Sequence, residues 1–218
     1  MDGIQSLIDF ILDRVDLIWA STYRHIQYVI AVLATAIVIS VAVGIFVRHR
    51  PLYREVALGI ASVFLTLPSL ALFVIFIPLV GLGFLPAYIA LTMYAILPIL
   101  RNTVTGLNAV SPAVLESAKG MGLSSRQRLW RIELPLAWPV IMAGVRVSTL
   151  LTTGIAAIAV LVGGGGLGDF ILSGLRRLGL PTSYESMWTG TIMVILLALA
   201  FDVVFILITR LTTSRGLR

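Results

Sequence analysis

Five long apolar segments, separated by shorter polar stretches, constrain the fold of this chain more than any other feature. A helix that crosses the hydrocarbon core of a bilayer needs roughly 20 mostly apolar residues. Segments of that length and character lie at 26–47, 56–79, 84–106, 136–162 and 187–209. We therefore predict an all-α, polytopic membrane helix bundle with five transmembrane helices, forming one domain over residues 1–218 with lipid around it.

The composition supports a membrane protein and excludes several other classes. Of the 218 residues, 59% are hydrophobic and 12% are charged, whereas soluble domains carry about twice that charged fraction. The net charge of +6 would suggest nucleic acid in a soluble chain, but here it matches the Lys/Arg excess of cytoplasmic loops, so no nucleic-acid partner is expected. The chain has no cysteine, which excludes disulfides and cysteine metal sites.

The first 22 residues differ from the five apolar segments. Asp9, Asp13, Arg14 and Asp16 interrupt them, and the sequence begins without the basic region of a cleaved signal peptide. Their apolar residues recur at helical spacing: Ile4, Leu7, Ile8, Ile11, Leu12, Val15 and Ile18. This pattern predicts an amphipathic helix over residues 1–22 that lies at the membrane interface or on the bundle.

The distribution of Lys and Arg predicts the orientation. Eleven of the 16 lie on the side that carries the loops after the first and third segments and the C-terminus, four lie on the other side, and Arg146 lies within a segment. Because cytoplasmic loops carry the excess of Lys and Arg, the eleven-residue side is expected to be cytoplasmic. The N-terminus is then outside, and the C-terminus and the loop 108–135 are inside.

The loop 108–135 is the longest polar interruption between two apolar segments, and its turn chemistry predicts a pair of short helices. Ser111 is suited to cap the first, with Pro112 in its first turn. Gly122 is suited to the left-handed residue that ends it. Ser124 and Gln127 have the spacing of a capping box for a second helix.

Two charged residues lie inside apolar segments. Arg146 is in the fourth and Asp202 in the fifth, and at 1.5 Å per residue both are roughly 12–15 Å from the cytoplasmic boundary. A charge at that depth usually pairs or lines water. We expect the two to form an ion pair or to line one cytoplasmic vestibule, and both a transport role and a purely structural role remain open.

The glycine-rich stretch after the fourth segment contains Gly163, Gly165 and Gly168 in the spacing G-x-G-x-x-G, followed by Asp169. It follows a membrane helix rather than a strand, and no G-K-[ST] follows it, so it is not expected to bind phosphate. We interpret it as a sharp outer turn. The sequence contains no recognisable metal cluster or catalytic triad.

The spacing of certain residues in the loop 108–135 resembles the pattern of a known protein family. The cytoplasmic loop of ABC-importer permeases has the pattern E-A-A, three residues, G, nine residues, I-x-L-P. Here these positions are Glu116, Ser117, Ala118, Gly122, Ile132, Leu134 and Pro135, with Ser117 as the one departure. The chain resembles the permease subunit of a type I ABC importer over nearly its whole length.

Within that class the chain is most similar to osmoprotectant permeases for glycine betaine, carnitine or choline. The supporting stretches are LPLAWPVIMAGVR (134–146), GGGGLGDFI (163–171) and ALAFDVV (198–204). The resemblance implies a second permease subunit, identical or different, a cytoplasmic ABC ATPase dimer and an external substrate-binding protein. It also implies that the loop helices couple to the ATPase, which binds ATP and Mg²⁺, so this chain itself has no cofactor and is not an enzyme. The location implied is the bacterial cytoplasmic membrane.

Three alternatives stay open. A type I permease for methionine or alkyl sulfonates would share the loop pattern and the five-helix core. An ion-coupled secondary transporter often has internal repeats, and none is visible in this sequence. A purely structural membrane subunit would have no reason to carry the loop spacing.

Overall fold

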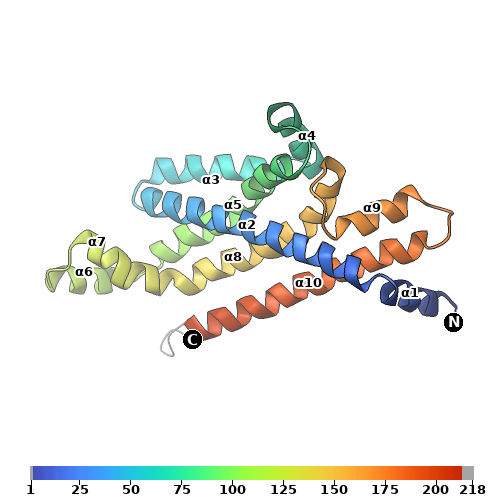
Figure 1. Ribbon diagram of the computed structural model, residues 1–218. Helices are drawn as coiled ribbons and strands as arrows, with labels where there is room; N and C mark the ends of the chain where they lie inside the picture. The colour runs from blue at the N-terminus through green and yellow to red at the C-terminus, as the bar shows by residue number, and fades with distance from the viewer. Residues whose placement is uncertain (1, 213–218) are drawn as a thin grey trace.

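The computed structural model describes residues 2–212, and every regular element in that range is a helix. The all-α class predicted from the sequence is confirmed. Residue 1 and residues 213–218, which include Arg215 and Arg218 of the orientation argument, lie outside the described residues. The helices form an elongated bundle with α6 and α7 at one end and α1 and α9 toward the other (Figure 1).

Within residues 2–212, four helical stretches are long and apolar enough to cross a membrane. They are α2 (Val15–Val47), α5 (Phe84–Asn108), the continuous stretch Ser125–Val162 and α10 (Ser183–Thr212). The predicted segment 56–79 is instead two helices, α3 (Pro51–Thr66) and α4 (Ser69–Val80), bent by 100°. The number of spans is therefore four, or five if the bent pair counts as one.

Proline causes the bend between α3 and α4. Leu67 and Pro68 have extended backbone angles, and Pro68 has no N–H to continue the helical ladder. The carbonyl left free at Leu67 accepts a hydrogen bond of 2.5 Å from the Tyr94 hydroxyl of α5. The bend is thus fixed by a partner on a neighbouring helix.

The N-terminal region differs from the single helix expected over residues 1–22. Helix α1 (Asp2–Leu12) ends before Asp13, and α2 begins at Val15, so residues 15–22 are the first turns of a 33-residue helix. Arg14 leaves the helical conformation at the junction, with φ −125°, and places its guanidinium 4.0 Å from the centre of the Phe10 ring. The helix is therefore interrupted at residues 13–14, and Arg14 packs back over the Phe10 ring of α1.

Helix α5 occupies the centre of the bundle and packs against α2, α3, α4 and α8. Its interface with α8 (Leu134–Ala156) is closest where α8 has a glycine. A Cβ built at Gly144 would lie 2.6 Å from the carbonyl oxygen of Pro98 and 2.7 Å from the Asn102 Cβ. The neighbouring Ser148 donates a hydrogen bond of 2.8 Å to the Ala95 carbonyl. Small residues therefore allow the two helices into backbone contact.

The stretch after α8 contains structure that the sequence did not predict. Helix α8 tightens into the 3-10 helix η2 (Ala157–Val162), and four glycines later a short helix α9 (Gly168–Arg176) packs against α10. The region expected as one outer turn is therefore a turn followed by a helix. With only nine residues, α9 is too short for its periodicity to stand out in the sequence.

Substituting two glycines of α8 tests the close contact with α5: Gly144 lies in that contact, and Gly154, which has open space around it, serves as the control. Gly144→Ala should lower the free energy of unfolding by about 1–3 kcal/mol, because the added methyl overpacks the contact with α5. Gly154→Ala should instead leave stability unchanged or raise it by up to about 1 kcal/mol, because no atom lies within 4 Å of the added Cβ. Thermal unfolding of the purified variants checks both, and equal shifts would contradict the close α5–α8 contact.

Candidate functional site

The loop 108–135 contains α6 (Pro112–Gly120), which follows the end of α5 after three residues. Pro112 occupies the first turn, where its missing N–H has no partner to lose. The Ser111 side chain makes no cap bond; its carbonyl accepts the N–H groups of Val114 and Leu115 at 3.1 and 3.2 Å. Backbone geometry rather than a side-chain cap therefore begins this helix.

The end of α6 explains the spacing between Ala118 and Gly122. Gly122 has φ +80°, and its N–H donates to the Lys119 carbonyl at 3.0 Å, while the N–H of Leu123 donates to the Ala118 carbonyl at 3.1 Å. These two bonds form a Schellman motif, whose left-handed position favours glycine. Ala118 is fully buried beneath the turn, where only a small side chain fits.

The second loop helix is a single turn, α7 (Ser125–Arg128), held by a capping box. Gln127 donates its backbone N–H to the Ser124 hydroxyl at 3.3 Å, and the Ser124 N–H donates to the Gln127 side chain at 2.8 Å. Helix α7 runs on without a break into the π-helical turn η1 (Leu129–Glu133) and then into α8. The predicted separate second helix is therefore the start of the fourth apolar segment.

The π-helical turn lies next to Pro135. The Leu134 N–H bonds to the Leu129 carbonyl five residues earlier, and Pro135 has no N–H to offer. A local π-turn shifts the hydrogen-bonding register where an α-helical ladder would lack a donor. Ile132, Leu134 and Pro135 of the loop pattern thus form the base of the loop, where it joins the bundle.

Of the other pattern residues, Glu116 and Ser117 lie on the exposed surface of α6, whereas Ala118 is buried. Glu116 and Ser117 are exposed, and exposed apolar side chains flank them, with Val114 at 41% and Met121 at 71% of full exposure. Helix α6 contacts little but α7, and the two stand at one end of the bundle (Figure 1). A mixed apolar and charged surface on a protruding helix is suited to docking a partner protein.

Glu133 is a residue of this loop that the sequence did not single out. It is 4% exposed, and its carboxylate lies 3.1 Å from Nε of Arg48 at the end of α2. Arg48 also donates a hydrogen bond of 2.7 Å to the Ile45 carbonyl. The pair ties the base of the loop to the first long helix. The pattern I-x-L-P leaves this position open, so spacing alone could not reveal it.

The two intramembrane charges meet. Arg146 on α8 donates to Asp202 on α10 in a bidentate pair, with distances of 2.5 Å from Nε to Oδ1 and 2.7 Å from Nη2 to Oδ2. Their side chains are 43% and 21% exposed. Arg146 lines a hollow of about 460 Å³ between the two helices. The contact holds α10 to α8 and also borders a space, so geometry alone assigns neither role.

The outer turn is built on glycines in left-handed conformations, with φ +89° at Gly163 and +72° at Gly165. Gly163 approaches the backbone of Gly83, whose N–H donates to the Val162 carbonyl at 2.7 Å. Gly168 packs against the backbone of Ala157. Partial burial raises the pKa of the Asp169 carboxyl above its ordinary value, against the attraction of Arg24.

His25 anchors this outer turn, a role that the sequence gave no sign of. The Leu167 N–H donates to Nδ1 at 3.3 Å, and Nε2 lies 3.0 Å from the Thr153 carbonyl. Because Nδ1 accepts, Nε2 carries the proton and donates it to Thr153. The neutral ring thereby joins α2, α8 and the glycine turn.

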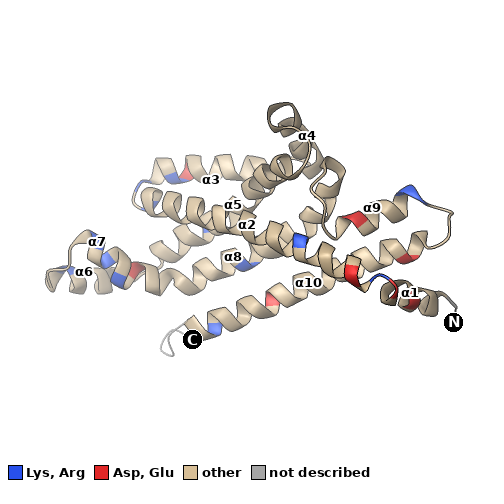
Figure 2. Ribbon diagram, viewed as in Figure 1, with Lys and Arg blue, Asp and Glu red and all other residues tan. Residues whose placement is uncertain are grey.

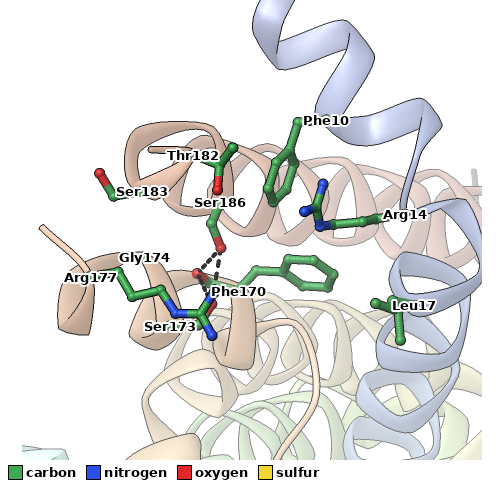
Figure 3. Close-up of a pocket in the computed structure, with 10 residues that line it drawn as sticks. All are labelled: Phe10, Arg14, Leu17, Phe170, Ser173, Gly174, Arg177, Thr182, Ser183 and Ser186. Carbon is green, nitrogen blue, oxygen red and sulfur yellow. Dashed lines mark hydrogen bonds between the residues drawn. The ribbon is translucent and has the colours of Figure 1, made fainter. Parts of the chain in front are cut away.

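A small hollow at the end of the bundle opposite α6 and α7 lies between α1, the start of α2, α9 and α10, and Figure 3 shows its lining. The hydroxyls of Ser173 and Ser186 lie 3.0 Å apart, and both donate to the Phe170 carbonyl, at 3.0 and 2.7 Å. Because each hydroxyl has a single proton and both protons go to the Phe170 carbonyl, these two serines fasten α9 to α10.

Charged residues gather toward the ends of the bundle, and the middle carries few (Figure 2). Among residues 2–212, no group of His, Asp and Glu side chains could hold a metal ion. The positively charged α6–α7 end carries the loop pattern, and the opposite end carries the glycine turn and the acidic residues of α1.

Comparison with known proteins identifies the family to which this chain is related. Residues 36–213 match the family described as "Binding-protein-dependent transport system inner membrane component". The chain is 41% identical over 197 residues to the choline transport system permease protein OpuBB of Bacillus subtilis (strain 168), covering 90% of this chain and 89% of the relative. It is 39% identical to the glycine betaine/carnitine/choline transport system permease protein OpuCB of the same strain, with the same coverage.

A third relative spans nearly the full length. The osmoprotectant import permease protein OsmW of Salmonella typhimurium (strain LT2) is 36% identical over 217 residues, covering 97% of this chain and 99% of the relative. Among solved structures, one of the MetNI methionine ABC transporter in inward facing conformations matches with a TM-score of 0.80 at 24% identity, covering 93% of this chain and 99% of that chain. The structural match shows the fold.

Fold, loop and relatives together define an inner-membrane transport component. The chain belongs to the family of binding-protein-dependent transport system inner membrane components. It is a permease of the type I ABC importers.

If Arg146 of α8 and Asp202 of α10 stabilise the bundle as an ion pair, substitutions of the two residues should have non-additive effects on stability. Arg146→Ala and Asp202→Ala should each lower the melting temperature, because each leaves a charge without its partner inside an apolar segment. The double variant should cost less than the sum of the single variants. Thermal unfolding in detergent checks this, and strict additivity would mean that the two sites act independently.

The exchanged pair Arg146→Asp with Asp202→Arg separates the two roles that the geometry leaves open. A structural pair predicts that the exchange restores both stability and uptake. A role in the transport path predicts that stability returns while uptake does not.

Proposed function

We propose that this permease is the transmembrane subunit of an ATP-driven importer for a small osmoprotectant of the glycine betaine, carnitine or choline type. The proposal rests on the identity of 36–41% to three relatives over 90–97% of the chain. One is named for choline, one for glycine betaine, carnitine and choline, and one for osmoprotectant import. The methionine transporter shares the fold at 24% identity, which does not favour methionine as the substrate.

The orientation proposed puts the α6–α7 end in the cytoplasm and the N-terminus outside. Three arginines of the loop, Arg126, Arg128 and Arg131, support this assignment together with the Lys/Arg bias of the whole chain. A separate ABC ATPase dimer would then meet the exposed surface of α6, and ATP with Mg²⁺ would be bound and hydrolysed there. An external substrate-binding protein would deliver the substrate at the opposite end, and this chain itself would catalyse no reaction.

A second permease subunit, identical or different, completes the proposed assembly. Its support is the long apolar surface of α10, of which only 6% of the most apolar 18-residue window is buried. Leu199, Val203 and Leu207 are all more than half exposed there. Lipid and a partner subunit are both apolar enough to cover this surface.

The mechanism follows from differential stabilisation of two bundle states. ATP closes the ATPase dimer, α6 and α7 move with the surface that holds them, and the bundle opens outward to receive substrate. Hydrolysis returns the bundle to the inward state. A partner shifts such an equilibrium only through unequal affinity for the two states, so the contact with α6 has to differ between them.

Reconstitution of the permease with its ATPase and binding protein tests the function. Proteoliposomes supplied with ATP should accumulate labelled choline or glycine betaine and should exclude labelled methionine. Uptake of methionine alone would contradict the substrate assignment and leave the permease class intact.

Two variants of α6 test the coupling. Glu116→Lys should weaken ATPase binding by roughly 2–5 kcal/mol if this charge contacts a partner, and Gly122→Asp should distort the turn because φ is +80° there. Both should lower co-purification of the ATPase and substrate-stimulated ATP hydrolysis.

Glu55→Lys, an exposed charge reversal on α3 at the same end of the bundle, is the matched control and should retain both activities. Normal complex yield from Glu116→Lys and Gly122→Asp would mean that this loop does not couple.

A further inference from the structure

A basic hollow of about 470 Å³ lies between α3 and α5, at the end of the bundle that carries α6 and α7. Two arginines from different helices line it, Arg54 near the start of α3 and Arg101 seven residues before the end of α5. Thr105 and Asn108 continue the same face of α5 one and two turns later. Helices α3 and α5 pack side by side (Figure 1).

The polar groups of this hollow have donors to spare. Within residues 2–212, neither guanidinium forms an ion pair or a hydrogen bond, and the side chains of Thr105 and Asn108 donate to no other described group. No acidic side chain lines the hollow. Two like charges that share a hollow without a counter-charge repel each other, and an anion between them removes that cost.

The surroundings fix the level of the hollow in the membrane. Leu58 and Val104 line it on the apolar side. At the neighbouring end of α2 and start of α3, the exposed rings of Phe46 and Tyr53 lie 4.5 and 5.6 Å from the Arg50 guanidinium. Exposed aromatic rings beside arginine are typical of the headgroup level of a bilayer. The hollow thus opens where apolar chains and phosphate groups meet.

We propose that this hollow binds the phosphate of an anionic phospholipid. Arg54 and Arg101 supply the charge-assisted hydrogen bonds, Thr105 and Asn108 supply neutral donors, and an acyl chain follows Leu58 and Val104 along α3 and α5. Guanidinium groups suit phosphate because their N–H groups match its oxygens in pairs. Basic pockets between membrane helices on the cytoplasmic side bind such headgroups, and the orientation proposed above places this hollow there.

Native mass spectrometry of the detergent-purified permease complex tests the site. The complex is incubated with phosphatidylglycerol or phosphatidylcholine, and the retained lipid is counted. Wild type should retain phosphatidylglycerol in preference to phosphatidylcholine. Arg54→Gln and Arg101→Gln should each lower that retention about fivefold, whereas Arg54→Lys should keep most of it. Arg50→Gln, which removes the same charge outside the hollow, should leave retention unchanged.

Three outcomes would overturn the proposal. Equal loss from Arg50→Gln would mean that general surface charge, rather than the hollow, holds the lipid. Displacement of phosphatidylglycerol by excess inorganic phosphate would make this a site for small free anions. Unchanged lipid retention with reduced co-purification of the ATPase would assign the two arginines to a partner's carboxylates. None of these readouts depends on uptake, so failure here leaves the proposed transport function standing.

Discussion

The backbone contact between α5 and α8 is the interaction on which the rest of the structure depends. At Gly144 the two helices lie so close that a side-chain Cβ added there would collide with the Pro98 carbonyl oxygen. The loop helices are extensions of this same pair: α6 follows α5 after three residues, and α7 runs through η1 into α8 without a break. A displacement of the loop therefore moves the two most tightly packed helices of the bundle together, because packed interiors transmit strain.

Polar contacts connect the remaining helices to this pair at different depths. Glu133 holds Arg48 of α2 at the loop end, Asp202 of α10 holds Arg146 of α8 within the apolar region, and His25 joins α2 to α8 and the glycine turn at the far end. Each contact involves a charged or strongly directional group whose loss leaves a partner unsatisfied. The bundle is thus linked along its length, which suits a protein that changes between two states as a unit.

Local chemistry made the loop predictable, and long-range contacts made much of the rest unpredictable. The Gly122 turn and the Ser124–Gln127 box depend on residues within a few positions of one another, and so their geometry followed from spacing. The 100° bend at Pro68 depends on a hydroxyl 27 residues away. Glu133 and His25 gain their roles from partners on distant helices, and the break at Asp13 depends on Arg14 turning to Phe10. Arg146 and Asp202 were predictable because charges are so costly in apolar segments that a partner was expected.

The central claim, that the exposed surface of α6 faces the cytoplasm and meets the ATPase, is most directly tested by labelling single cysteines, since the chain has none of its own. Ser117→Cys on α6 and Leu178→Cys between α9 and α10 are both at exposed positions. In membrane vesicles, an impermeant maleimide should reach Ser117→Cys only from the cytoplasmic side, and bound ATPase should protect it. Leu178→Cys should react only from outside. Labelling of Ser117→Cys from outside, or from the cytoplasmic side at an unchanged rate with the ATPase bound, would contradict the account.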